Sequence, residues 1–133
     1  MTTGPVVLPD THTLYWYTTG SSRISRPARE VFARAAAGEC VLALSPIVLA
    51  ELYWLLRKQG TGTVFSGVVQ RFRASPAYAF EPLTFEDLAA LPTWEEIPEL
   101  HDRLIAIQAA RLGAMLVTRD PALQACKRIH CLW

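Results

Sequence analysis

The sequence has little of what marks several large classes of protein. Its three cysteines, Cys40, Cys126 and Cys131, are an odd number, and no two of them form a CxxC pair. This argues against a disulfide framework and favours a reduced, cytoplasmic setting. The net charge is +1 over 133 residues, so no general basic field attracts nucleic acid, and such binding would need a local patch.

Long apolar runs are also missing. The longest apolar stretch, residues 41–56, is interrupted by Ser45, Pro46 and Glu51, so we expect no membrane span. No basic segment followed by a long apolar run opens the chain, and we therefore expect no signal peptide. The sequence has no Walker A loop and no GxGxxG fingerprint, and its His and Cys residues match no standard zinc spacing.

The residues that are present describe a globular α/β chain. A hydrophobic fraction of 51% and a mean hydropathy of +0.19 argue against disorder. The length predicts a single domain, residues 1–133, with one ordinary core. Strand-like apolar runs alternate with helical patterns, which indicates a mostly parallel central sheet of about five strands flanked by helices. We expect strands at 6–8, 40–44, 78–83, 114–118 and 128–133, and helices at 12–17, 25–38, 46–60, 63–73, 85–91 and 98–112.

Four acidic residues lie beside apolar sequence, where an unpaired carboxylate is costly. They are Asp10, Glu51, Asp102 and Asp120. Asp10 and Asp120 each follow a predicted strand, and ligands of parallel α/β sheets bind at the carboxyl ends of strands. Glu51 is the only charge in residues 47–56, a helix that is apolar on all sides and is expected to be buried.

Each of these acids also has a simpler explanation when taken alone. Asp10 and Asp120 could be helix caps or turn residues. Asp102 could be a first-turn acid that the helix dipole favours, and Glu51 could pair with an Arg or cap a backbone group. Together they are harder to explain, because two carboxylates ~5 Å apart repel by roughly 3 kcal/mol at an effective dielectric of ~20. A hard divalent cation, Mg²⁺ or Mn²⁺, would compensate them and could activate water against a phosphoryl group.

Several motifs, in this order, resemble the PIN domain family and specifically VapC-type ribonuclease toxins. The matching segments are VVLPDTHTLYW at 6–16, LSPIVLAEL at 44–52, HDRLIAIQA at 101–109, LVTRD at 116–120 and IHCLW at 129–133. The resemblance implies that Asp10, Glu51, Asp102 and Asp120 bind the metal and carry catalysis. It also puts the hydroxyl of Thr118 near the site, and we expect Thr11, in the first motif, to support it. The sequence departs from the family pattern at Pro9, which removes a backbone donor, and in having no further acid after Asp120.

A few other side chains are candidates for contact with the substrate. Arg103 and Arg119 are the best candidates to touch phosphate, because they neighbour Asp102 and Asp120, although a solvated basic surface explains them equally well. His12 lies near Asp10 and His101 beside Asp102, and both could make minor contacts with substrate. The aromatic residues that could stack on bases are better explained by core packing or an oligomer interface; they are Tyr15, Trp16, Tyr53 and Trp54.

The resemblance implies a Mg²⁺- or Mn²⁺-dependent endoribonuclease that acts on RNA, is restrained by a small cognate antitoxin and forms a homodimer. One alternative is a PIN nuclease of RNA processing with no antitoxin. Another is a catalytically silent PIN-like binding module. Leu104 and Ile107 lie away from the Asp102 face of their helix, so we expect them to form an apolar surface that a partner covers.

Overall fold

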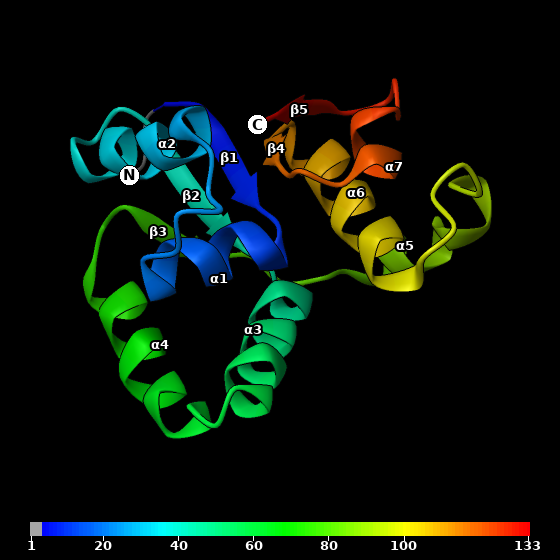
Figure 1. Ribbon diagram of the computed structural model, residues 1–133. Helices are drawn as coiled ribbons and strands as arrows, with labels where there is room; N and C mark the ends of the chain where they lie inside the picture. The colour runs from blue at the N-terminus through cyan, green and yellow to red at the C-terminus, as the bar shows by residue number, and fades with distance from the viewer. Residues whose placement is uncertain (1–3) are drawn as a thin grey trace.

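The strands of the computed structural model, which describes residues 4–133, form one sheet in the order β3-β2-β1-β4-β5 (Figure 1). The strands are β1 Val6–Pro9, β2 Val41–Leu44, β3 Tyr78–Phe80, β4 Met115–Val117 and β5 His130–Leu132. Every neighbouring pair is parallel, which confirms the predicted α/β class. The first three residues of the predicted domain lie outside the described residues.

The strand order creates a natural place for a site. Strand β1 pairs with β2 through Val7 and Leu42, and with β4 through Leu8 and Leu116. The chain first moves outward from β1 to β3 and then crosses to β4 and β5 on the other side. The connections therefore diverge between β1 and β4, and such a switch point leaves a crevice at the carboxyl ends of the strands.

The helices begin and end close to where the sequence signals place them. They are α1 Thr11–Thr19, α2 Arg26–Ala36, α3 Pro46–Lys58, α4 Phe65–Ala74, α5 Phe85–Ala89, α6 Leu100–Leu112 and α7 Pro121–Gln124, with 3-10 turns at η1 Gly62–Val64 and η2 Leu91–Thr93. Ser25 and Ser45 cap α2 and α3 through their side chains, and Gly113 ends α6 with a φ of 63°. In Figure 1, α3 and α4 form the two arms of a hairpin, while α6 and α7 lie beside β4 and β5.

Helix α6 is buried more completely than the sequence indicates. Leu104 and Ile107 are only 5% and 4% exposed, so the predicted partner surface built on them is wrong. The reason is that α6 contacts α3, α5, η2 and β4, so the domain itself covers both residues.

Helix α3 shows the opposite deviation, because the prediction of burial on all sides is wrong. Its buried residues are Val48, Leu52 and Leu56, whereas Tyr53 and Trp54 are 42% and 54% exposed. Since α3 packs against α1 and α6, only one of its faces is covered. None of the described helices is both long enough and apolar enough to cross a membrane.

Candidate functional site

Asp10 is held rigidly at the point where β1 ends and α1 begins. Its Oδ1 accepts from the backbone N–H of Thr13 at 2.9 Å and lies 2.6 Å from the Thr13 hydroxyl. Its Oδ2 accepts from the hydroxyl of Thr118 at 2.5 Å, and its backbone N–H donates to the carbonyl of Val117 at 3.0 Å. Asp10 is therefore an N-cap and, at 8% exposure, also an oriented carboxylate at the switch point.

Thr118 joins the ends of β1 and β4. Its fully buried hydroxyl donates to Asp10 and accepts from the backbone N–H of Asp120 at 3.0 Å. Asp120 in turn caps α7, because its Oδ1 accepts from the N–H of Leu123 at 3.1 Å. Like Asp10, Asp120 combines the role of a cap with a place at the end of a strand.

Glu51 is held between two other elements. Its Oε1 accepts from the Thr11 hydroxyl of α1 at 2.6 Å, and its Oε2 lies 3.0 Å from Nδ1 of His101 at the start of α6. Because a carboxylate can only accept, Nδ1 of His101 carries the proton in this contact. The neighbouring Glu99 lies 3.7 Å from the same nitrogen. Thr11 thus supports the position of Glu51, and its part in the site stays a prediction.

Asp102 lies where the acids meet. It lines two adjoining pockets together with Asp10 and His12. The first, which we call the β4-side pocket, also contains Trp16, Arg119 and Asp120. The second, the α3-side pocket, also contains Thr11, Glu51, Trp54 and Glu99. Four acids that are distant in sequence are thereby brought to one end of the sheet.

The electrostatics of Asp102 reflect this crowding. Burial, followed by the charges of Asp120, Glu99, Asp10 and Glu51, raises the pKa of Asp102 to about 7. In a carboxyl group shifted in this way, burial and the neighbouring negative charges disfavour the ionised form. The pocket is therefore suited to binding positive charge.

The side chains around Asp102 have the chemistry of ligands for a hard divalent cation, but they are not yet arranged around one metal position. Residues 4–133 contain no group of three or more His, Cys, Asp or Glu side chains already arranged around a metal position. The side chains around Asp102 nevertheless offer carboxylate oxygens, the ligands that Mg²⁺ and Mn²⁺ prefer. A cation would have to draw these carboxylates together for them to share it.

The two candidate phosphate-binding arginines differ in their surroundings. Arg103 donates from Nε to the carbonyl of Ile97 at 2.7 Å and from a terminal nitrogen to that of Leu91 at 3.2 Å. It ties the segment before α6 to the helix, which is a structural role, and its contact with phosphate stays a prediction. Arg119 is exposed, with its guanidinium carbon 4.6 Å from the centroid of the Trp16 ring, and its role as a phosphate ligand stays a prediction.

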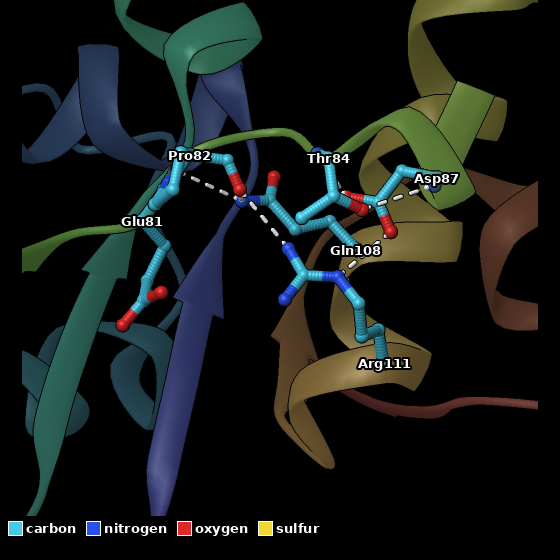
Figure 2. Close-up of polar contacts among 6 residues, drawn as sticks. All are labelled: Glu81, Pro82, Thr84, Asp87, Gln108 and Arg111. Atoms are coloured by element: carbon cyan, nitrogen blue, oxygen red, sulfur yellow. Dashed lines mark hydrogen bonds and ion pairs between the residues drawn. The ribbon is translucent and has the colours of Figure 1, made fainter.

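A polar network that sequence reasoning missed anchors α6 (Figure 2). Arg111 donates to Oδ1 of Asp87 at 2.7 Å and to the carbonyl of Pro82 at 3.0 Å, while Gln108 donates to the carbonyl of Glu81 at 3.0 Å. Burial alone would raise the pKa of Asp87, but hydrogen bonds from Arg111 and Thr84 outweigh it and hold that pKa below its usual value. The network fixes residues 81–87 against the helix that carries Asp102.

Only part of this network has a sequence signal. Thr84 and Asp87 have the spacing of a capping box, and the structure forms it with Thr84 as the cap of α5. Thr13 was also missed, although it stands three residues after Asp10, the spacing of an N-cap contact. The pairing of Asp87 with Arg111 has no local pattern, because α5 meets α6 only in the folded chain.

A parallel α/β domain with an acidic crevice at its switch point is the class of protein that this fold and site define. A model of the PIN domain family matches residues 7–128, and the chain belongs to that family. Comparison with curated protein sequences gives no match.

Solved structures with the same fold include three complexes. VapBC2 from Rickettsia felis, bound to a DNA fragment from their promoter, has a TM-score of 0.73 at 17% identity, over 96% of this chain and 97% of that one. FitAcB from Neisseria gonorrhoeae has a TM-score of 0.67 at 18% identity, over 94% and 95%. A toxin–antitoxin complex from Klebsiella pneumoniae has a TM-score of 0.62 at 20% identity, over 92% and 94%. At these identities the likeness shows the fold alone.

Proposed function

We propose that the protein is a Mg²⁺- or Mn²⁺-dependent endoribonuclease and the toxin of a VapBC-type toxin–antitoxin pair. The observation that carries the proposal is the gathering of Asp10, Glu51, Asp102 and Asp120 around two adjoining pockets at the switch point. Membership of the PIN family supports a nuclease, and the likeness of the fold to VapBC2 and to a Klebsiella toxin–antitoxin complex supports the toxin assignment.

The four acids would hold the metal, which when bound activates water and stabilises charge on the phosphodiester. The chain's own contribution is to orient these acids before substrate arrives. Thr13 and Thr118 fix Asp10, and Thr11 and His101 fix Glu51. Asp102, whose pKa is about 7 in the metal-free chain, ionises fully once positive charge enters the pocket. The expected product is RNA cleaved to leave a 5′ phosphate.

The test is cleavage of RNA by the purified protein with Mn²⁺, with a chelator added, and in the Asp10→Asn variant. We expect cleavage that needs Mn²⁺ and is lost in Asp10→Asn. Glu30→Gln is the matched control, because Glu30 is an exposed acid of α2 paired with Arg26 and lies outside both pockets. Full activity of Asp10→Asn, with circular dichroism showing the same fold, would contradict the proposal.

The two alternatives predict different outcomes. A silent binding module should show no Mn²⁺ binding that depends on the four acids. A PIN nuclease of RNA processing should cleave RNA but should have no neighbouring antitoxin gene and no toxicity that a neighbouring gene relieves. Expression of the protein with and without that gene, with cell growth as the readout, separates toxin from processing enzyme.

We propose that the antitoxin covers the exposed face of α3. The face of α6 that carries Leu104 and Ile107 is already covered within the domain. Trp54 lines the α3-side pocket and also a shallow pocket with Ile47, Ala50 and His101, so an apolar partner segment there would lie directly beside Glu51. A basic side chain of that segment would occupy the acids in place of metal. Trp54→Ala should weaken the complex in calorimetry, whereas removal of the exposed Val64 side chain should not. Homodimer formation stays a prediction, which sedimentation of the isolated protein tests.

A further inference from the structure

Arg119 is an exposed arginine whose side chain lies against an aromatic ring. It stands between Thr118 and Asp120, just after β4, and its guanidinium carbon lies 4.6 Å from the centroid of the Trp16 ring. Trp16 is buried, and its ring packs 5.8 Å from that of Trp133 and 5.5 Å from that of His12. The guanidinium therefore lies over a ring that its neighbours hold in place, which orients it before any ligand binds.

Among residues 4–133, no hydrogen bond uses the guanidinium donors of Arg119, unlike those of Arg103 and Arg111. Within residues 4–133 the side chain forms no ion pair, even though Asp120 is its neighbour in sequence. Arg103 and Arg111, in contrast, donate to backbone carbonyls. Among the described residues, Arg119 is also the one Arg or Lys that lines either acidic pocket. A preoriented guanidinium with free donors, beside acids that repel phosphate, is suited to bidentate recognition of a phosphate.

We propose that Arg119 binds the phosphate next to the scissile one in an RNA strand, on the Asp120 side of the acids, and that Trp133 positions it through Trp16. This inference rests on the proposed nuclease function. Asp10 and Asp102 line both pockets, so the scissile phosphate belongs between the pockets. Arg119 lines only the β4-side pocket, and it therefore meets the adjoining phosphate of a strand that crosses the acids.

The test separates binding from cleavage. Binding of a labelled RNA oligonucleotide is measured by fluorescence anisotropy over a range of KCl concentrations, in an Asp10→Asn background so that the RNA stays intact. In that background, Arg119→Ala should weaken binding roughly tenfold, the size of one charge-assisted contact. The slope of log affinity against log salt should fall by about 0.7, as expected for one lost phosphate contact to a single strand. Arg119→Lys should keep the slope but recover only part of the affinity, because an ammonium group is not a planar fork.

Kinetics with Mn²⁺ in the otherwise wild-type chain test the same point. Arg119→Ala should raise KM with kcat within about twofold, since the contact is made equally in the ground and transition states. Trp133→Ala should raise KM in the same way, and Trp133→Phe should restore it because a ring again supports Trp16. A structural defect would lower the active fraction and kcat instead.

Arg73→Ala is the matched control. Arg73 is exposed in the last turn of α4, which packs beside β3 at the opposite edge of the sheet from β5, and its removal changes the net charge equally. If Arg119→Ala and Arg73→Ala have the same salt slope and KM, while the wild type cleaves RNA and Asp10→Asn does not, the inference is overturned and the proposed function stands. If the wild type neither binds nor cleaves RNA, both fail.

Discussion

The hydroxyl of Thr118 donates a 2.5 Å hydrogen bond to Oδ2 of Asp10 across 108 residues of sequence. The contact exists because β1 and β4 are neighbours in the sheet, with Pro9 opposite Val117. Both residues are buried, so Asp10 takes this hydrogen bond from the protein in place of bulk water. The orientation of Asp10 therefore depends on a side chain of the other central strand.

Thr118→Val removes this donor while keeping the shape of the side chain. We expect Mn²⁺ affinity to fall by about 10- to 100-fold, the usual effect of losing a residue that orients a metal ligand. The free energy of unfolding should fall by about 1–3 kcal/mol, because Asp10 and the N–H of Asp120 each lose a partner. Mn²⁺ titration and urea denaturation measure the two effects. Thr118→Ser keeps the hydroxyl and should retain most of the Mn²⁺ affinity and of the free energy of unfolding. If the Ser and Val variants lost both quantities equally, the assigned role of Thr118 would be contradicted.

Asp102→Asn should abolish Mn²⁺-dependent cleavage and stabilise the metal-free protein at pH 8. The folded-state pKa of about 7 lies above the ordinary value of 3.8, so between these pH values the folded chain holds a proton that the unfolded chain has lost. The contribution of this group to stability therefore falls as pH rises from about 4 to 7 and is least favourable above 7.

The variant removes this penalty, so at pH 8 it should be more stable than the wild type by on the order of 1–2 kcal/mol, after allowance for solvent screening. At pH 5 the difference should be smaller, and it should vanish only below about pH 4, where Asp102 is protonated in both the folded and the unfolded wild type. Thermal unfolding in a chelator at both pH values measures this. A sharp loss of stability at pH 8 would instead identify Asp102 as a structural residue of α6.

Divalent metal should stabilise the wild type and not the variants of its acids. A ligand that binds only the folded state at a hundred times its dissociation constant adds about 2.7 kcal/mol. We expect Mn²⁺ to raise the unfolding temperature of the wild type, a chelator to reverse the shift, and Asp10→Asn to show little of it. An equal shift in wild type and Asp10→Asn would place the metal elsewhere.

Arg111→Met should destabilise the fold without touching the acidic pockets. The buried carboxylate of Asp87 would lose its cation, at a cost of about 2–4 kcal/mol, since Arg111 itself is partly exposed. The lowered pKa of Asp87 contributes stability at neutral pH that is lost as pH falls through that pKa. The variant should therefore be less stable than the wild type at pH 7. On acidification, it should lose the stability that Asp87 contributes at a higher pH than the wild type does. Denaturation from pH 7 to pH 3 tests both, and the Asp87→Asn/Arg111→Met double variant should recover part of the loss.

Local rules in the sequence were enough for much of the fold. Ser25, Ser45 and Gly113 mark helix ends because their side chains, or the lack of one, satisfy backbone groups within a few residues. The number of strands and their positions along the chain were predicted, although β3 is shorter than the predicted strand at residues 78–83. The N–H of Glu81 still bonds to Leu44, but Pro82 cannot donate and the strand ends.

The sequence by itself determined that Asp10 and Asp120 follow strands and that four acids stand in apolar surroundings. Only the tertiary structure decided what lies against each of them: Thr118 on Asp10, and Thr11 and His101 on Glu51. It also decided that Leu104 and Ile107 are covered while Trp54 is not. The physical reason is that periodicity defines the faces of a helix, whereas the strand order and the packing of α3 and α6 decide which faces meet another element and which meet water.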